Sequence, residues 1–125
     1  MKTLFSSVLL FCFASICLGQ NSAEIIGSWT FTNVTSTDAS CKSVDYFPIQ
    51  TFKFNSDGGA EFKSGEGLAK AKFRVKENSI ELYDLSENGV KQDGSAEFKI
   101  KQLTSTILIL TVAYECGSID VHFKK

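Results

Sequence analysis

Few side chains in this sequence combine a reactive type with a position where chemistry could occur. The strongest candidate is Asp84, because strand alternation points its carboxylate into an apolar interior opposite Ala71, where an unpaired charge is costly. Such a carboxylate would anchor a hydroxyl or a cation of a bound molecule, with Tyr114 nearby. The alternative is that a local bulge turns Asp84 outward, or that loop amides bond it, because aspartates are mostly exposed in folded proteins.

The remaining titratable residues suggest no reaction. His122, between Val121 and Phe123, would face outward, and it has neither convergent metal ligands nor a serine or cysteine nucleophile at a suitable spacing. Basic residues alternate over 70–76, as is typical of the solvated face of a strand rather than of an anion site. We therefore expect a protein without a metal site, a cofactor or enzymatic activity.

Residues 1–19 predict a signal peptide. Lys2 is followed by a mostly apolar, uncharged stretch, and the small residues Cys17 and Gly19 precede a cleavage point after residue 19. A retained anchor is the weaker alternative, because serines interrupt a core that is shorter than the roughly 20 residues of a membrane span. We expect a secreted or periplasmic single domain at residues 20–125, with no membrane span in the mature chain.

Cleavage would leave two of the four cysteines, Cys41 and Cys116. An even pair in an exported chain predicts a disulfide, whereas a metal site would need further ligands and a redox pair a C-x-x-C spacing. Without Lys2, the mature chain has 12 of the 13 basic residues and all 14 acidic residues, which gives a formal net charge of −2. This balance argues against nucleic acid as a partner, which would require a concentrated positive surface.

The mature chain alternates apolar and polar residues with period two, which predicts an all-β fold without a substantial helix. We expect eight strands, at residues 27–35, 49–55, 60–63, 69–76, 79–85, 92–103, 107–115 and 119–124. Turns at 56–58 and 77–78 give consistent hairpin registers, and a bulge near Gly94 would keep the next hairpin in phase. The opposite pairs expected from these turns are Phe52 and Phe62, Phe73 and Leu82, and Leu82 and Ala96.

A single antiparallel eight-stranded up-and-down barrel buries one apolar face per strand without a helical layer, and a flattened two-sheet sandwich is the alternative. In such a barrel, the first, third, fifth and seventh connections between consecutive strands lie at the same end and form one mouth. The inward residues at that mouth are small. Bulky inward residues, Trp29 among them, would plug the other end. The long connection at 36–47, tied by the predicted disulfide, is suited to be a lid. The residues expected to contact a ligand are Ala71, Asp84, Gly94, Ala96 and Tyr114 at the mouth, with Tyr46 and Phe47 on the lid.

The sequence Gly-Ser-Trp at residues 27–29 opens the first strand, and Trp29 is the only tryptophan. Together with an exported single barrel and a long first connection, this G-x-W motif resembles the lipocalin superfamily, more closely the short lipocalin-like proteins that bacteria export. The motif is carried by Gly27 and Trp29, and the resemblance spans the mature chain. It implies that the tryptophan packs at the closed end beneath a basic side chain such as Lys124 or Lys125. It also implies binding of a small, largely apolar molecule in the cup.

The leading function is therefore binding of a small hydrophobic or amphipathic molecule in a shallow cavity at the mouth, by an exported monomer. An eight-stranded barrel is just wide enough to be filled by its own side chains or to hold one small ligand, so we expect room only at the small-residue end. The alternative is a non-enzymatic interaction module, such as an inhibitor or envelope-associated protein, that acts through the same connections. An exposed apolar rim at the mouth would favour that alternative.

Overall fold

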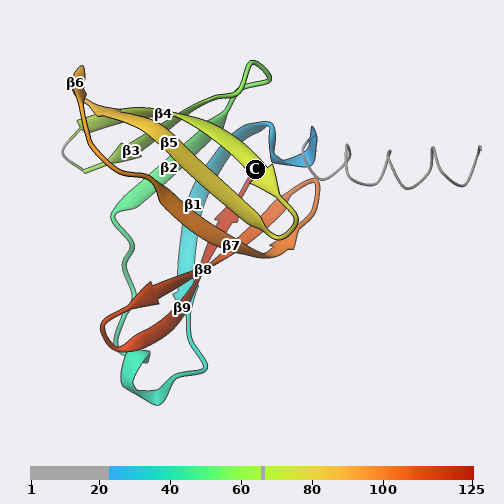
Figure 1. Ribbon diagram of the computed structural model, residues 1–125. Helices are drawn as coiled ribbons and strands as arrows, with labels where there is room; N and C mark the ends of the chain where they lie inside the picture. The colour runs from blue at the N-terminus through green and yellow to red at the C-terminus, as the bar shows by residue number, and fades with distance from the viewer. Residues whose placement is uncertain (1–22, 66) are drawn as a thin grey trace, which may run out of the picture.

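The computed structural model describes residues 23–65 and 67–125, so the predicted signal peptide lies outside the described residues (Figure 1). Within this part of the chain, no helix is long and apolar enough to cross a membrane. A 3-10 helix, η1 (Ala39–Cys41), lies in the long connection after the first strand. The strands in chain order are β1 (Gly27–Thr35), β2 (Ile49–Phe54), β3 (Gly59–Ser64), β4 (Gly67–Lys76), β5 (Ser79–Glu87), β6 (Val90–Lys91), β7 (Ala96–Leu103), β8 (Ile107–Tyr114) and β9 (Gly117–Lys124).

The strands pair in the order β4-β3-β2-β1-β9-β8-β7-β5, and β4 also pairs with β5. The two ends of the sheet therefore meet, and eight antiparallel strands form a closed barrel. The short strand β6 extends the edge of β5 through the pair Glu87 and Val90. The predicted up-and-down barrel is confirmed, and the sandwich alternative is wrong.

The hairpin registers follow the predicted turns. Phe52 lies opposite Phe62, Phe73 opposite Leu82, and Leu82 opposite Ala96. One predicted strand, at 92–103, is wrong at its start, because residues 92–95 form an irregular connection between β6 and β7. Gly94 in this connection has a φ of +97°, a conformation that glycine adopts without strain. This irregular connection lies where the bulge was predicted, and after it Ala96 of β7 faces the interior opposite Leu82.

Trp29 fills the closed end of the barrel. Its side chain is fully buried, and its Nε1 donates a hydrogen bond to the carbonyl of Ile25 at 2.8 Å. The Lys125 Nζ lies 5.1 Å from the ring centroid, which is the basic partner that the lipocalin resemblance implied for Lys124 or Lys125. Gly27 has a φ of +132°, and a Cβ there would meet the Lys125 Cε at 2.5 Å. The glycine therefore lets the C-terminal lysine cross the tryptophan ring.

Phenylalanine rings fill much of the interior. Phe52 is almost fully buried on β2 and is the centre of an aromatic cluster drawn from four strands. Its ring centroid lies 5.4 Å from that of Phe54, 5.6 Å from Phe62, 6.2 Å from Phe98 and 5.4 Å from Phe123. These separations are those of favourable stacked and edge-on aromatic contacts. Side chains therefore occupy the middle of the barrel, as the width of an eight-stranded barrel permits.

The strands diverge at the mouth. β1 pairs with β2 only from Gly27 to Thr30, but it follows β9 as far as Thr35. In the same way, β8 leaves β7 after Thr111 but stays with β9 as far as Tyr114. Register shifts in β1 and β7 lie next to these points and increase the local twist. The ends of β1, β8 and β9 therefore extend as a three-stranded arm beyond the rest of the barrel (Figure 1).

Candidate functional site

The long connection between β1 and β2, residues 36–48, is fastened to the tip of the arm; we call it the β1–β2 loop. The predicted disulfide between Cys41 and Cys116 is present, with the two Cα atoms 5.3 Å apart. Beside it, the Asp38 carboxylate accepts a hydrogen bond from the Ser118 amide at 2.7 Å, and the Ser40 hydroxyl donates to the carbonyl of Cys116 at 2.8 Å. The Ser36 hydroxyl also donates to the carbonyl of Ser118, so one covalent bond and three hydrogen bonds hold the loop at the mouth.

The two aromatic residues of the predicted lid have different positions. Tyr46 is 56% exposed, whereas Phe47 is only 4% exposed and belongs to the core. The Phe47 ring packs edge-on against Phe123, with centroids 6.5 Å apart, and lies 6.4 Å from the ring of Tyr114. That these two residues contact a ligand stays a prediction, but only Tyr46 is exposed on the surface of the loop. The Phe47 ring fills the mouth half of the barrel from the β1–β2 loop.

The predicted inward orientation of Asp84 is also wrong. Two β5 residues, Asp84 and Leu85, stand opposite the single β4 residue Ala71, and Asp84 has a φ of +50°. This bulge leaves the Asp84 side chain 56% exposed, 3.5 Å from the Nζ of Lys72, while Leu85 packs against the core. Aspartate is enriched at positive φ among non-glycine residues, so its residue type was the one signal in the sequence for the bulge. Asp84 therefore lies on the outer surface and cannot anchor a molecule inside the barrel.

The small residues of the predicted mouth are divided between the interior and a surface connection. Ala71 is buried at 8% exposure, and Ala96 is half-buried against the core. Gly94 lies instead in the exposed connection before β7, so its predicted place on the interior wall is wrong. Its role there is conformational, since the chain turns at its positive φ.

The inward side chains near the divergence of β7 and β8 are incompletely covered. Ala96 and Phe98 on β7, and Val112 and Tyr114 on β8, face the interior but are only half-buried. By contrast, Leu110 lies on the same face of β8 before the divergence and is fully buried. The end of the pairing between β7 and β8 depends on contacts distant in the sequence. The alternation of apolar and polar residues along each strand therefore did not predict that Phe98 and Val112 would lie beside an opening.

Two surface hollows border the mouth. One, of about 560 Å³, lies along the free end of β8 beside Ala113, Tyr114 and Cys116. The other, of about 260 Å³, lies between the β1–β2 loop at Tyr46 and the turn between β3 and β4 at Gly65. Both are open depressions rather than enclosed cavities, and they flank the half-buried apolar residues of the mouth.

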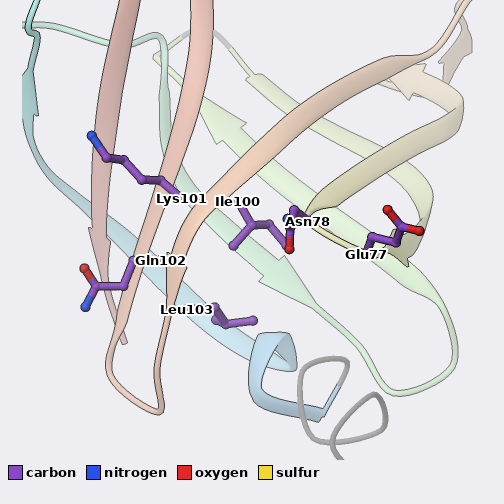
Figure 2. A pocket seen from close by; sticks show the side chains of 6 residues that line it. All are labelled: Glu77, Asn78, Ile100, Lys101, Gln102 and Leu103. Atoms are coloured by element: carbon purple, nitrogen blue, oxygen red, sulfur yellow. The ribbon is translucent and has the colours of Figure 1, made fainter.

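A smaller hollow of about 150 Å³ lies toward the other end, between the β4–β5 turn and β7. The Ile100 amide donates to the carbonyl of Asn78 at 2.6 Å, which holds this turn against β7. Figure 2 shows that the charged side chains of Glu77 and Lys101 point away from each other and from the hollow. Because no polar groups converge there, this hollow is a less suitable binding site than the mouth.

The two carboxylates with perturbed pKa values, Glu81 and Asp120, both belong to ion pairs. The hydrogen bond from Arg74 is the main cause that lowers the pKa of Glu81, which lies opposite Arg74 in the pairing of β4 and β5. Burial alone would raise the pKa of Asp120, but hydrogen bonds from Lys101 and Thr111 outweigh it and lower that pKa. Within residues 23–65 and 67–125, no group of three or more His, Cys, Asp and Glu residues is placed to hold a metal ion.

The mouth itself contains one partly buried hydroxyl of interest, on Tyr114. Burial raises the pKa of this hydroxyl, and the nearby Tyr46 raises it further. The neutral phenol therefore persists over a wide range of pH and can donate or accept a hydrogen bond. His122, by contrast, faces outward as predicted, and its Nε2 lies 2.8 Å from the Thr35 hydroxyl.

Comparison with known proteins agrees with this geometry. No protein-family model and no curated protein matches the chain. A crystal structure of a lipocalin-like protein from Bacteroides uniformis is similar, with a TM-score of 0.57 and 17% sequence identity over 82% of this chain and 98% of that chain. The fold is lipocalin-like. An uncharacterized protein from Bacteroides eggerthii shares this lipocalin-like barrel, with a TM-score of 0.52 and 18% identity over 80% of this chain and 98% of that chain.

Proposed function

We propose that this protein is an exported binding protein, without enzymatic activity, for one small hydrophobic or amphipathic molecule at the mouth of its lipocalin-like barrel. One observation carries the proposal. The inward side chains of Val112 and Tyr114, beside the divergence of β7 and β8, are half-buried, although Leu108 and Leu110, deeper on the same face of β8, are fully buried. A ligand that covers Phe98 and Val112 would complete the core, because burial of apolar surface is favourable.

The chemistry of the mouth favours a largely apolar ligand with at most one polar group. The interior residues there are aliphatic and aromatic, and the Tyr114 hydroxyl can bond one oxygen or nitrogen atom of the ligand. Asp84 lies outside the barrel, so it supports no recognition of a cation. The rings of Phe47 and Phe52 occupy the space below, which favours a shallow seat near the mouth over a deep one.

Export is supported by two independent features. The sequence of residues 1–19 has the pattern of a signal peptide. The disulfide between Cys41 and Cys116 would form and persist in an oxidising compartment, such as the periplasm or the extracellular space.

The binding site can be tested with the fluorescent apolar probe N-phenyl-1-naphthylamine and two variants of neighbouring residues. Val112→Phe adds a ring on the inward face of the opening, whereas Lys99→Phe adds a ring on the exposed outer face of β7, next to Phe98. We expect saturable binding by the wild type, a loss of at least about tenfold in affinity for Val112→Phe, and no change for Lys99→Phe.

Native mass spectrometry of the purified protein would add the mass of a co-purified ligand. Two results would contradict the proposal. One is a folded wild-type protein that does not bind the probe at a saturable site. The other is equal affinity in the wild type and in Val112→Phe, which would place the probe elsewhere.

A further inference from the structure

Large apolar side chains are exposed at three places in the part of the chain that the structure describes, and all three lie toward the mouth end of the barrel, with Leu68 on its outer face. Tyr46 in the β1–β2 loop is 56% exposed, Leu68 at the start of β4 is 43% exposed, and Val90 in β6 is 63% exposed. Isolated exposed apolar residues are ordinary, but these lie in or next to three connections at one end of one barrel. We call Tyr46, Leu68 and Val90 the apolar rim.

The connections that carry the apolar rim are in contact with one another. The Asn88 amide, in the turn before β6, donates to the carbonyl of Leu68 at 3.1 Å. On the other side, the hollow of about 260 Å³ is lined both by Tyr46 and by Ser64 and Gly65, at the turn that leads to β4. The connections beside the three residues of the apolar rim are therefore neighbours at the mouth end of the barrel.

The character of the apolar rim favours a lipid surface over a protein. A stable protein interface buries about 800 Å² on each partner around a packed centre, and three half-exposed side chains separated by polar turns provide no such centre. The interface of a bilayer needs no matching shape, accepts each side chain independently and favours tyrosine at the level of the headgroups.

Charge further defines the kind of lipid. The described connections of the mouth, at 36–48, 65, 88–89, 92–95 and 115–116, contain one lysine and four acidic residues. This excess of carboxylates would be repelled by anionic headgroups, so attraction must come from apolar contact. The charged residues concerned are Lys42, Asp38, Asp45, Asp93 and Glu115.

We propose that the apolar rim docks the mouth weakly and reversibly on a zwitterionic lipid bilayer. In this orientation the plugged end of the barrel faces away from the bilayer. The opening between β7 and β8 then lies close to the bilayer. The biological use of this docking, collection or delivery of an apolar ligand, rests on the proposed binding function. The docking itself is measurable without any ligand.

The test is flotation with vesicles of phosphatidylcholine, and with matched vesicles that contain phosphatidylglycerol. A triple variant, Tyr46→Ser, Leu68→Ser and Val90→Ser, removes the apolar rim at exposed positions, and circular dichroism checks its fold. A second triple variant, Tyr46→Trp, Leu68→Phe and Val90→Phe, enlarges it. We expect the wild type to float with phosphatidylcholine, the serine variant to lose at least about tenfold in partitioning, the enlarged variant to gain, and phosphatidylglycerol to give no increase.

Three outcomes would overturn the docking proposal: no flotation of the wild type at millimolar lipid, equal partitioning of the wild type and serine variant, or partitioning that requires phosphatidylglycerol. The first of these would favour a protein as the partner of the apolar rim. The probe titration in lipid-free solution reports the ligand site separately, so either proposal can fail while the other stands.

Discussion

Phe47 gives the sharpest test of how the β1–β2 loop contributes to the fold. Its side chain is 4% exposed and contacts the rings of Phe123 and Tyr114, whereas the adjacent Tyr46 is 56% exposed. Removal of a buried phenylalanine ring costs about 3–5 kcal/mol, of which each aromatic contact accounts for about 0.5–1.5 kcal/mol. We therefore expect Phe47→Ala to lower the free energy of unfolding by about 3–5 kcal/mol, and Tyr46→Ala to change it by less than about 0.5 kcal/mol.

The measurement is urea unfolding with the disulfide intact, followed by the fluorescence of the buried Trp29. A small domain has about 5–15 kcal/mol of total stability, so Phe47→Leu, with an expected loss of about 1.5 kcal/mol or less, covers the case in which the alanine variant does not fold. A loss below about 1 kcal/mol for Phe47→Ala would refute the reasoning. It would mean that the ring does not pack in the barrel in solution and that the loop is a peripheral cover.

Three further predictions concern other parts of the barrel. Replacement of Cys41 and Cys116 by serine should cost about 4–5 kcal/mol in urea unfolding, from the entropy of a loop with a sequence separation of 75; a loss below about 1 kcal/mol would contradict this account. The hydrogen-bonded Asp120 has a lowered pKa, so its stabilisation is complete above the unfolded pKa of about 4 and is lost as the pH falls through the folded value. Asp120→Asn should therefore flatten the dependence of the urea midpoint on pH below 4, and an unchanged slope would argue against it. Gly27→Ala should cost about 1–3 kcal/mol because of its φ of +132°, whereas Gly65→Ala, with open space around it, should be nearly neutral in thermal unfolding.

The barrel could be predicted from the sequence because its main determinants are local. Apolar residues alternate along each strand, and short turns fix which residues face each other, as for Phe52 and Phe62. The disulfide followed from an even pair of cysteines in a chain with the pattern of an exported protein.

The candidate site was less predictable because it depends on departures from that regularity. A single extra residue in β5 moves Asp84 from the inner to the outer face, and alternation alone gives no account of a bulge. The burial of Phe47 and the partial exposure of Phe98 depend on where β7 and β8 separate and on how a long loop folds back. These are contacts between distant parts of the chain, which periodicity does not report.

The contact of Lys125 with Trp29 determines where a label, a support or a fused domain can be attached to the protein. The Lys125 Nζ donates to the carbonyl of Glu24 at 3.1 Å, so the start and the end of the barrel domain lie side by side at the plugged end. A fluorescent label, a solid support or a fused domain joined through a linker at either terminus would sit opposite the mouth. The same proximity would allow a short linker to join the two ends, with new termini opened in the exposed turn between β4 and β5, in a circularly permuted chain that keeps every strand pair.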